Sequence, residues 1–411
     1  MRYQNSGSDL KTNYLRMKKI YQWLNNFLFI KGGESFDITI IDDVFPFHIS
    51  PWRNIDYLNL AKHFKVKIYC DKPQSNKAIP GKKTFESLST DFEEHYPNHN
   101  INYKELNLFS PLNSKIVYLL FFNYVHRYYK HLKKHNQPFV FTLYAGGGFQ
   151  VNNPEIDKFL KEVFSDKLFK GCIVNQKFIY NYLINKKLIH PDKLLYSIGP
   201  TNIDFLFNKI NDINKLYYRK NKKTFDIIFA SNKYMPYALD KGYDVFIETA
   251  WALIQKYDFI RFHVVGPFTD NEIIYQDLKP YVTYYGYQDE EFLIDLFQKM
   301  DVNMIPCRPF VAQPGHFDGF PTGISLISAL TNVVMLITDF LNENDFLEDG
   351  KDFFCINKGI ENIIKIIESL IESPEKLISI GNSGKRKFIE RFKNDSLDQR
   401  TEFFKKIIEE I

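Results

Sequence analysis

The stretch HFDGFPTGISLISALT, residues 316–331, places an acidic side chain, a proline and two glycines directly before an apolar run. Asp318 stands beside Gly319, and Gly323 opens the run that predicts a helix. The first turn of a helix exposes backbone N–H groups at the positive end of its dipole, and glycines let a phosphate group approach that backbone closely. The loop therefore predicts an anion site, although a tight turn that requires glycine would give the same pattern.

Strand-like apolar runs alternate with amphipathic, helix-like runs along most of the chain. The expected strands are 36–46, 65–70, 138–149, 170–176, 193–200, 225–231, 260–267, 282–287, 301–307 and 332–339. The expected helices are 12–29, 52–64, 114–135, 243–257, 289–300, 322–331, 359–392 with breaks at Pro374 and near Gly381, and 396–410. This alternation is typical of a parallel sheet covered by helices on both faces.

The chain has 411 residues, more than one hydrophobic core usually supports, and the alternation starts again near residue 225. We therefore predict two successive doubly wound α/β domains. They comprise a first domain at 1–205, a linker at 206–224, a second domain at 225–385, and a C-terminal helix at 386–411 that packs back on the outside. Ligands are expected at the carboxyl ends of the strands, in a cleft between the domains.

Composition excludes several classes of protein. Apolar residues make up 45% and charged residues 25%, as in ordinary globular proteins. A net charge of +4 does not predict nucleic-acid binding, and four widely spaced cysteines suggest neither a zinc site nor a disulfide framework. The N-terminus is too polar for a signal peptide, and the longest uncharged apolar run, 116–125, is too short for a bilayer crossing. We expect a cytoplasmic protein.

The motif HFDGFPTG, followed by the apolar helix and ITDFLNEND, resembles the nucleotide-sugar-binding domain of retaining glycosyltransferases of family 4, the group 1 glycosyltransferases. The pair Lys241 and Gly242, VVGP at 264–267 and GYQDEEFLIDLFQKMDVNMIPC at 286–307 extend the resemblance over most of 225–345. The first half of the chain matches more loosely. The resemblance implies the GT-B fold, in which two Rossmann-like domains face each other across a cleft.

The resemblance also implies roles for individual residues. Asp318 corresponds to an acidic residue, usually glutamate, near the transferred sugar, and Lys241 to a basic residue that binds the diphosphate as charge builds on it. The family's arginine, a few residues before this lysine, is missing, and Lys233 is a candidate to replace it. The remaining donor-binding residues implied by the loop are Gly319, Phe320, Pro321, Thr322 and Gly323.

One departure from the family pattern bears on activity. The family has a second acidic residue eight or nine positions after the first, which holds the ribose hydroxyls, whereas this chain has Leu326 and Ile327 there. An aliphatic side chain cannot make these charge-assisted hydrogen bonds, each worth roughly 1.5–3 kcal/mol. Either the ribose is held differently or donor binding is weakened, so a catalytically inactive scaffold subunit stays open as an alternative. A sugar-nucleotide epimerase on the same fold is another.

The first half offers weaker candidates. Gly146 and Gly147 follow an expected strand and would let a donor or acceptor lie against bare backbone, and GGGF lacks the spacing of a dinucleotide fingerprint. His48 and Arg53 lie in a loop that could line the acceptor side. The run HRYYKHLKKH at 126–135 interleaves basic residues with tyrosines, which suits an anionic membrane surface, or simply a solvated helix end.

The combined hypothesis is a cytoplasmic enzyme that moves a hexose from a UDP- or GDP-sugar to a glycan or lipid-linked acceptor. The reaction would retain anomeric configuration and serve surface polysaccharide or glycoconjugate synthesis, with a peripheral position at the inner membrane face left open. No metal is expected, because Asp42 and Asp43 are adjacent rather than spaced as in a DxD pair. No cofactor is expected either, since the nucleotide sugar is itself a substrate.

Overall fold

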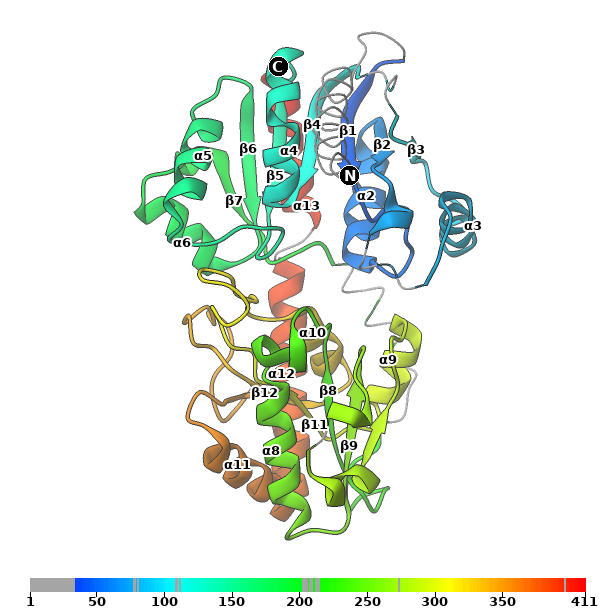
Figure 1. Ribbon diagram of the computed structural model, residues 1–411, viewed down its shortest axis with the longest axis vertical. Coiled ribbons are helices and arrows are strands. Elements are labelled where there is room, and N and C mark those ends of the chain that lie inside the picture. Colours follow the sequence, from blue (N-terminus) through cyan, green and yellow to red (C-terminus); the bar gives the residue numbers. More distant parts are fainter. Residues whose placement is uncertain are drawn as a thin grey trace, which may run out of the picture. The chain divides into compact units, whose positions relative to one another are not determined.

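The computed structural model describes residues 34–411 except 77–78, 80, 108–109, 111, 202–205, 207–209, 211–214, 273 and 395–396. The helix expected at 12–29 and part of the expected linker at 206–224 lie outside the described residues. The chain divides into two compact units (Figure 1). The first contains the described residues up to Thr142 with Glu162–Ile173 and Thr401–Ile411, and the second contains Leu143–Lys161 and Val174–Arg400. The domain boundaries proposed from the sequence stay predictions.

The N-terminal sheet has seven strands in the order β3-β2-β1-β4-β5-β6-β7. Their bounds are β1 Phe36–Asp42, β2 Val66–Cys70, β3 Asn102–Glu105, β4 Ser114–Leu120, β5 Phe139–Leu143, β6 Phe169–Val174 and β7 Leu194–Tyr196. The intervening helices are α2 Pro51–His63, α3 Phe85–His95, α4 Phe121–Lys134, α5 Pro154–Phe164 and α6 Lys177–Asn185. Within this sheet, β1 pairs in parallel with β2 and β4, an arrangement that requires such crossover helices.

The prediction of one long helix over 114–135 is wrong in its first seven residues. Residues 114–120 form β4, a strand paired in parallel with both β1 and β5, and α4 follows without any loop. Phe121, at the junction, adopts a left-handed backbone conformation with φ of 65°. A strand buried on both faces reads as a continuous apolar run, and such a run cannot be told from a buried helix by periodicity.

The C-terminal sheet has six strands in the order β10-β9-β8-β11-β12-β13. Their bounds are β8 Phe225–Ala230, β9 Ile260–Val265, β10 Val282–Tyr284, β11 Val302–Ile305, β12 Val334–Ile337 and β13 Phe354–Cys355. The helices are α8 Tyr243–Ile254, α9 Glu290–Phe297, α10 Gly323–Leu330, α11 Ile360–Glu372, α12 Pro374–Asn394 and α13 Leu397–Glu409. Two parallel-sheet Rossmann-like domains are thus present, as the alternating pattern predicts.

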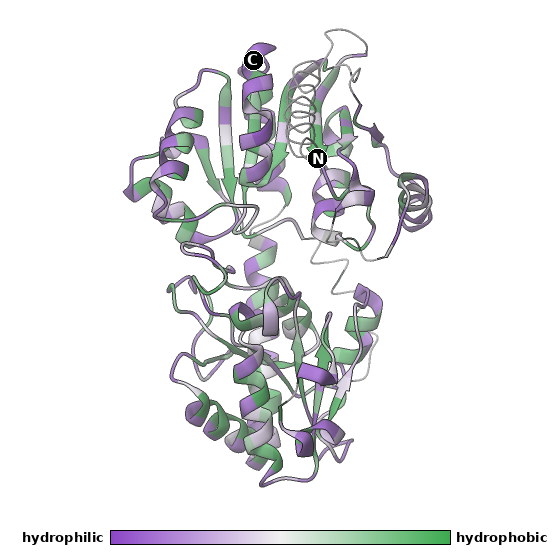
Figure 2. Ribbon diagram, viewed as in Figure 1, coloured by the Kyte–Doolittle hydropathy of each residue, from purple (hydrophilic) through white to green (hydrophobic). Residues whose placement is uncertain are grey.

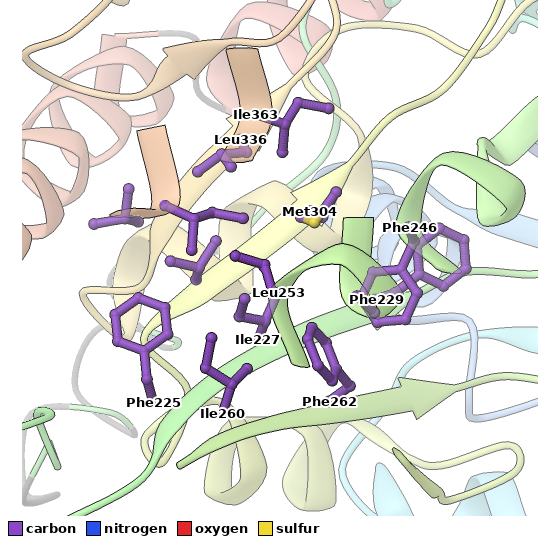
Figure 3. Close-up of a cluster of buried hydrophobic side chains, with 14 of the residues drawn as sticks. Phe225, Ile227, Phe229, Phe246, Leu253, Ile260, Phe262, Met304, Leu336 and Ile363 are labelled. Atoms are coloured by element: carbon purple, nitrogen blue, oxygen red, sulfur yellow. The ribbon is translucent and has the colours of Figure 1, made fainter. Parts of the chain in front are cut away.

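The core of the second unit joins strand side chains to the helix α8. Ile227 and Phe229 of β8 and Phe262 of β9 point into a cluster that also contains Phe246 and Leu253 of α8 (Figure 3). All five are buried, with at most 2% of their surface exposed. Colouring by hydropathy shows the apolar residues along the strands and the polar residues scattered over the helices (Figure 2).

The C-terminal helices differ from the prediction at one glycine. The break at Pro374 is confirmed, but α12 continues through Gly381. A Cβ atom at Gly381 would lie 2.4 Å from the carbonyl oxygen of Asn332, so the glycine permits close packing instead of ending the helix. Among the described residues, no helix combines the length and apolarity that a membrane crossing requires.

Residues of α13 complete the first unit. The Phe404 ring packs on Tyr118 of β4 with 5.0 Å between ring centroids, and Asn59 of α2 donates a hydrogen bond of 2.8 Å to the Thr401 hydroxyl. Gly171 of β6 leaves room for the Phe403 ring, whose nearest atom would lie 2.5 Å from an added Cβ. A segment distant in sequence therefore covers part of this sheet.

Candidate active site

The carboxyl ends of β8 and β11 lie next to a cavity of about 300 Å³ in the second unit. Neighbouring parallel strands end at the same edge of the sheet, which is where ligands bind in open α/β folds. The polar and aromatic lining residues include Phe229, Ser231, Asn232, Tyr234, Lys241, Asp318 and Thr322. The structure thus brings together the two residues that the sequence analysis placed at the centre of the reaction, Lys241 and Asp318.

Lys241 is the buried cation of this cavity. Its ammonium forms an ion pair with Asp318 and lies 3.6 Å from Oδ2 of Asp240, with 6% of the side chain exposed. The ring of Tyr234 has its centroid 5.0 Å from the same nitrogen. Burial opposes the charge of Lys241, but the nearby carboxylates, Asp318 foremost, outweigh it and raise the pKa above its ordinary value. Lys241 is therefore charged at neutral pH.

Gly242 and Arg308 fix the position of Lys241. A 3₁₀ turn, Pro236–Lys241, ends at Gly242, whose φ is 70° and whose added Cβ would lie 2.1 Å from the Pro306 carbonyl oxygen, so glycine is required. Arg308, after β11, donates to the Leu239 carbonyl at 2.9 and 2.6 Å and to the Asp244 carboxylate at 2.7 Å. Arg308 could not be found from the sequence, because nothing local marks it as the partner of a segment some 70 residues away.

The loop after Asp318 is anchored by Gln176, the residue before α6. A Cβ at Gly319 would lie 1.8 Å from Cδ of Gln176, and the backbone N–H of Phe320 donates to Gln176 Oε1 at 3.0 Å. The Phe320 ring is buried in an apolar cluster. The contacts of Gly319 and Phe320 with Gln176 and with the apolar cluster therefore hold the loop in place.

The start of α10 opens on the same cavity. Thr322 is the N-cap residue, its hydroxyl lies 3.1 Å from that of Ser325, and Gly323 and Ile324 also line the cavity. An added Cβ at Gly323 would meet nothing within 4 Å, so the first turn is open on that side. Pro321, which links Phe320 to the N-cap, is half-buried. The positive end of the α10 dipole therefore faces the cavity that holds Lys241.

Leu326 and Ile327 lie on α10 but do not line the cavity. Both are half-buried and pack against an apolar cluster that includes Leu330 and Met335. The two aliphatic side chains thus help to attach α10 to the sheet. A carboxylate in these surroundings would lose hydration.

Lys233, the candidate replacement for the missing arginine, does not line the cavity. It forms an ion pair with Glu272, and its ammonium lies 5.6 Å from the centroid of the Phe268 ring. Gly146 and Gly147 have φ of 99° and 57°, so both need glycine's conformational freedom, but neither lines the cavity. Their role as donor-binding residues stays a prediction.

The two acceptor-side candidates lie in the first unit. His48 stacks on His95 with 4.1 Å between ring centroids. Arg53 donates to Asp42 at 3.1 Å, and its guanidinium lies 4.3 Å from the centroid of the Trp52 ring. Arg53 thereby braces a buried carboxylate. An acceptor role for His48 or Arg53 stays a prediction.

Glu343 is a candidate that the sequence analysis missed. It is 4% exposed and lines a second, water-sized cavity of about 20 Å³ together with Asp318, Thr338 and Asp339. Its Oε2 atom has no hydrogen-bond partner among the described residues, and burial raises the pKa of Glu343 to about 8. The only sequence signal was its place in ITDFLNEND, within the resemblance.

The basic run of α4 turns its tyrosines inward. The hydroxyls of Tyr128 and Tyr129, both buried, donate to Asp71 at 2.7 Å and Asp166 at 2.9 Å. The outward face carries exposed basic side chains, of which Lys133 lies 3.5 Å from Asp166. The aromatic part of the predicted membrane-facing pattern therefore belongs to the core. No group of three metal-ligand side chains occurs among the described residues.

The fold and this site together define a class of protein. The two Rossmann-like domains form the GT-B fold, and residues 225–373 match the family described as Glycosyl transferases group 1. Residues 225–373 are therefore similar to the group 1 glycosyltransferases, and the resemblance found in the sequence is confirmed.

Solved structures share the fold over nearly the whole chain. Alr3699/HepE of Anabaena, in complex with UDP-glucose, has a TM-score of 0.62 at 13% identity, covering 92% of this chain and 100% of that one. A glycosyltransferase from Rickettsia africae ESF-5 has a TM-score of 0.63 at 15% identity, covering 90% and 98%. Sucrose-phosphate synthase from Thermosynechococcus elongatus has 0.61 at 11%, covering 91% and 100%. These identities support the fold alone, and no curated protein sequence matches the chain.

Proposed function

We propose that this protein is a group 1 glycosyltransferase that transfers a hexose from a UDP- or GDP-sugar to a glycan or lipid-linked acceptor with retention of configuration. The observation that carries the proposal is the pairing of Lys241 with Asp318 on the wall of a cavity that also receives the N-terminus of α10. A positive lysine, a helix N-terminus and a carboxylate are the groups that a diphosphate and a sugar ring need. The similar HepE structure holds UDP-glucose, which favours a UDP-sugar as the first donor to test.

The chemistry would rest on charge and position. The bond between the anomeric carbon and the diphosphate oxygen breaks, and the anomeric carbon forms a bond to the acceptor oxygen. The acceptor proton passes to the departing diphosphate or to water, and negative charge develops on the diphosphate as it leaves. Lys241 and the first turn of α10 would oppose that charge in a partly buried site, where fixed charges act more strongly than in water. Asp318 would bind the sugar hydroxyls and hold the ring in place. No step of this scheme calls for a metal ion.

Two other functions compete with this one. A non-catalytic scaffold is favoured by the aliphatic pair Leu326 and Ile327, which leaves the family's ribose carboxylate without a counterpart on α10. An epimerase would use the same donor cavity but would leave its product as a nucleotide sugar. Acceptor dependence therefore separates the enzymes from each other, and nucleotide binding separates both from the scaffold.

The deciding experiment is calorimetric titration of the purified chain with UDP-glucose and with GDP-mannose. We expect one of them to bind, and Lys241→Met to weaken that binding at least about tenfold, the loss of one charge-assisted hydrogen bond. Lys256→Met is the matched control, because Lys256 is 56% exposed and lies outside the cavity. Absence of binding by either nucleotide sugar would contradict a donor site. The anomeric configuration of the product, measured by NMR, would then test retention.

A peripheral position on an anionic membrane rests on the exposed basic residues of α4. Lys130 and Lys134 both lie on its outward face. Co-sedimentation with vesicles rich in phosphatidylserine should fall for Lys130→Glu with Lys134→Glu, because each basic residue near such a surface contributes about 1 kcal/mol. Equal co-sedimentation of the wild type with neutral vesicles would remove this part of the proposal.

A further inference from the structure

The cations near the donor cavity are already paired with carboxylates. Lys241 lies between Asp318 and Asp240, and Lys233 pairs with Glu272. When Asp240 and Asp318 are both ionised, these two carboxylates and the ammonium of Lys241 together carry one net negative charge. A nucleoside diphosphate is itself strongly negative, so it meets no free cation at Lys241 unless one of these pairs opens.

The two carboxylates that contact Lys241 are not equivalent. Asp240 is 3% exposed, and neither of its oxygens has a hydrogen-bond partner among the described residues, so its charge is compensated by the ammonium of Lys241. Separating this pair would leave a buried charge uncompensated, which is costly. Asp318 is 26% exposed and lines the cavity. Of the two, Asp318 is therefore the carboxylate that a bound ligand can supply with a new partner.

We propose that Asp318 is a specificity-determining residue that selects nucleotides carrying a sugar over the nucleoside diphosphate alone. A diphosphate that takes Lys241 as its partner deprives Asp318 of its counter-ion. The hydroxyls of a sugar attached to the diphosphate can donate hydrogen bonds to Asp318 and compensate for this loss, whereas a free nucleoside diphosphate has no group beyond its phosphates to do so. The proposal rests on the function proposed above and adds a role for the ion pair seen in the free protein.

The same exchange of partners acts in reverse after transfer. Once the sugar has moved to the acceptor, Asp318 loses its hydrogen bonds to the sugar hydroxyls and competes again for Lys241. The nucleoside diphosphate product then loses part of its hold on the lysine. The single carboxylate of Asp318 would therefore favour both the binding of the donor and the release of the nucleoside diphosphate product.

The test compares UDP with UDP-glucose, and GDP with GDP-mannose, by calorimetry on the wild type, Asp318→Asn and Asp318→Ala. A hydrogen bond to a charged group corresponds to roughly 10- to 100-fold in affinity. We expect the wild type to prefer the sugar-bearing form by at least about tenfold, and both variants to bind the nucleoside diphosphate at least about tenfold more tightly than the wild type. Asp270→Asn, a change at a 62% exposed carboxylate, should alter neither affinity.

The outcomes separate this inference from the proposed function. If the wild type binds a nucleotide sugar but neither Asp318 variant gains affinity for the nucleoside diphosphate, the partner exchange is wrong and the donor site stands. If the wild type binds no nucleotide sugar, both are overturned. Thermal unfolding of each variant shows whether it is folded, and the alanine variant keeps the test open if asparagine disturbs the loop.

Discussion

The side-chain amide of Gln176 occupies the space that a Cβ atom on Gly319 would need. The added atom would lie 1.8 Å from Gln176 Cδ, while Gln176 Oε1 accepts the N–H of Phe320 at 3.0 Å. Gly319 has no left-handed backbone conformation, so the glycine is explained by this close approach. Gln176, the residue before α6, thereby fixes the position of the loop that carries Asp318.

Substitution at Gly319 should therefore cost more than substitution at Gly323, four residues later. Gly319→Ala should destabilise the protein by about 1–3 kcal/mol, as expected for overpacking. Gly323→Ala is the matched control, since its Cβ meets nothing within 4 Å. It should be neutral or stabilising by up to about 1 kcal/mol. Urea denaturation measures both, and equal effects at the two glycines would disprove the packing argument.

A double-mutant cycle isolates the contact itself. Gln176→Ala removes the amide that the new methyl group would strike, so Gly319→Ala should cost less in that background than in the wild type. The expected coupling is about 0.5–3 kcal/mol, the range for residues in direct contact. Strictly additive free energies of unfolding would mean that Gly319 is constrained by something other than Gln176.

Lys241 should matter for stability as well as for binding. Lys241→Met leaves Asp240 buried without a counter-ion, which should destabilise the protein by about 3–5 kcal/mol. Adding Asp240→Asn removes the uncompensated charge and should recover most of that loss. Chemical denaturation of the two variants and the wild type measures these free energies of unfolding. A double variant no more stable than Lys241→Met would show that the loss does not come from an uncompensated charge on Asp240.

The buried carboxyl of Glu343 predicts a pH dependence of stability. Its pKa is raised by burial from 4.5 to about 8, so between these values the folded protein holds a proton that the unfolded chain releases. Stability should therefore fall as pH rises through this window. Glu343→Gln, which needs no proton, should flatten the decline in Tm between pH 5 and pH 8 and raise Tm above pH 8, whereas the exposed control Glu390→Gln should follow the wild type. A wild-type-like decline in Glu343→Gln would reject a buried protonated carboxyl.

Asp301 organises the base of the second sheet. It is fully buried, its Oδ2 accepts from the Asp226 backbone at 2.8 Å and pairs with Lys222 at 2.6 Å, and its Oδ1 accepts from the Tyr218 backbone at 3.1 Å. Asp301→Ala should cost about 3–5 kcal/mol, because it leaves buried donors and a lysine unpaired. Thermal unfolding should show no comparable loss for the exposed control Asp295→Ala, and similar losses in both would indicate a general effect on the region.

Local sequence patterns were sufficient to predict most of the strands. The expected strands at 225–231, 260–267 and 301–307 correspond to β8, β9 and β11, because buried parallel strands alternating with helices leave a strong apolar signal. At 114–120 the same signal failed, since β4 and α4 follow each other without polar punctuation. The helix break predicted near Gly381 was wrong for a related reason, because close packing and helix termination both favour glycine.

The site was less accessible to sequence reasoning than the sheets. Asp318 and Lys241 could be found from the resemblance, and the structure places them in one ion pair. Gln176 and Arg308 could not, because each acts on a segment far away in the chain through contacts that leave no periodic trace. Glu343 was hidden by its own setting, since a glutamate in a polar loop gives no sign that its carboxyl is buried.

The first compact unit can be completed only after α13, at the end of the chain, has been translated. Residues 401–411 belong to the first compact unit, although the ribosome makes them long after β4, whose Tyr118 they contact through Phe404. At roughly 5–20 residues per second, the intervening chain takes on the order of tens of seconds to translate. Throughout that time the part of the nascent sheet that α13 later contacts lacks this partner, so a ribosome stall in the intervening segment would prolong the exposure of apolar surface and favour aggregation.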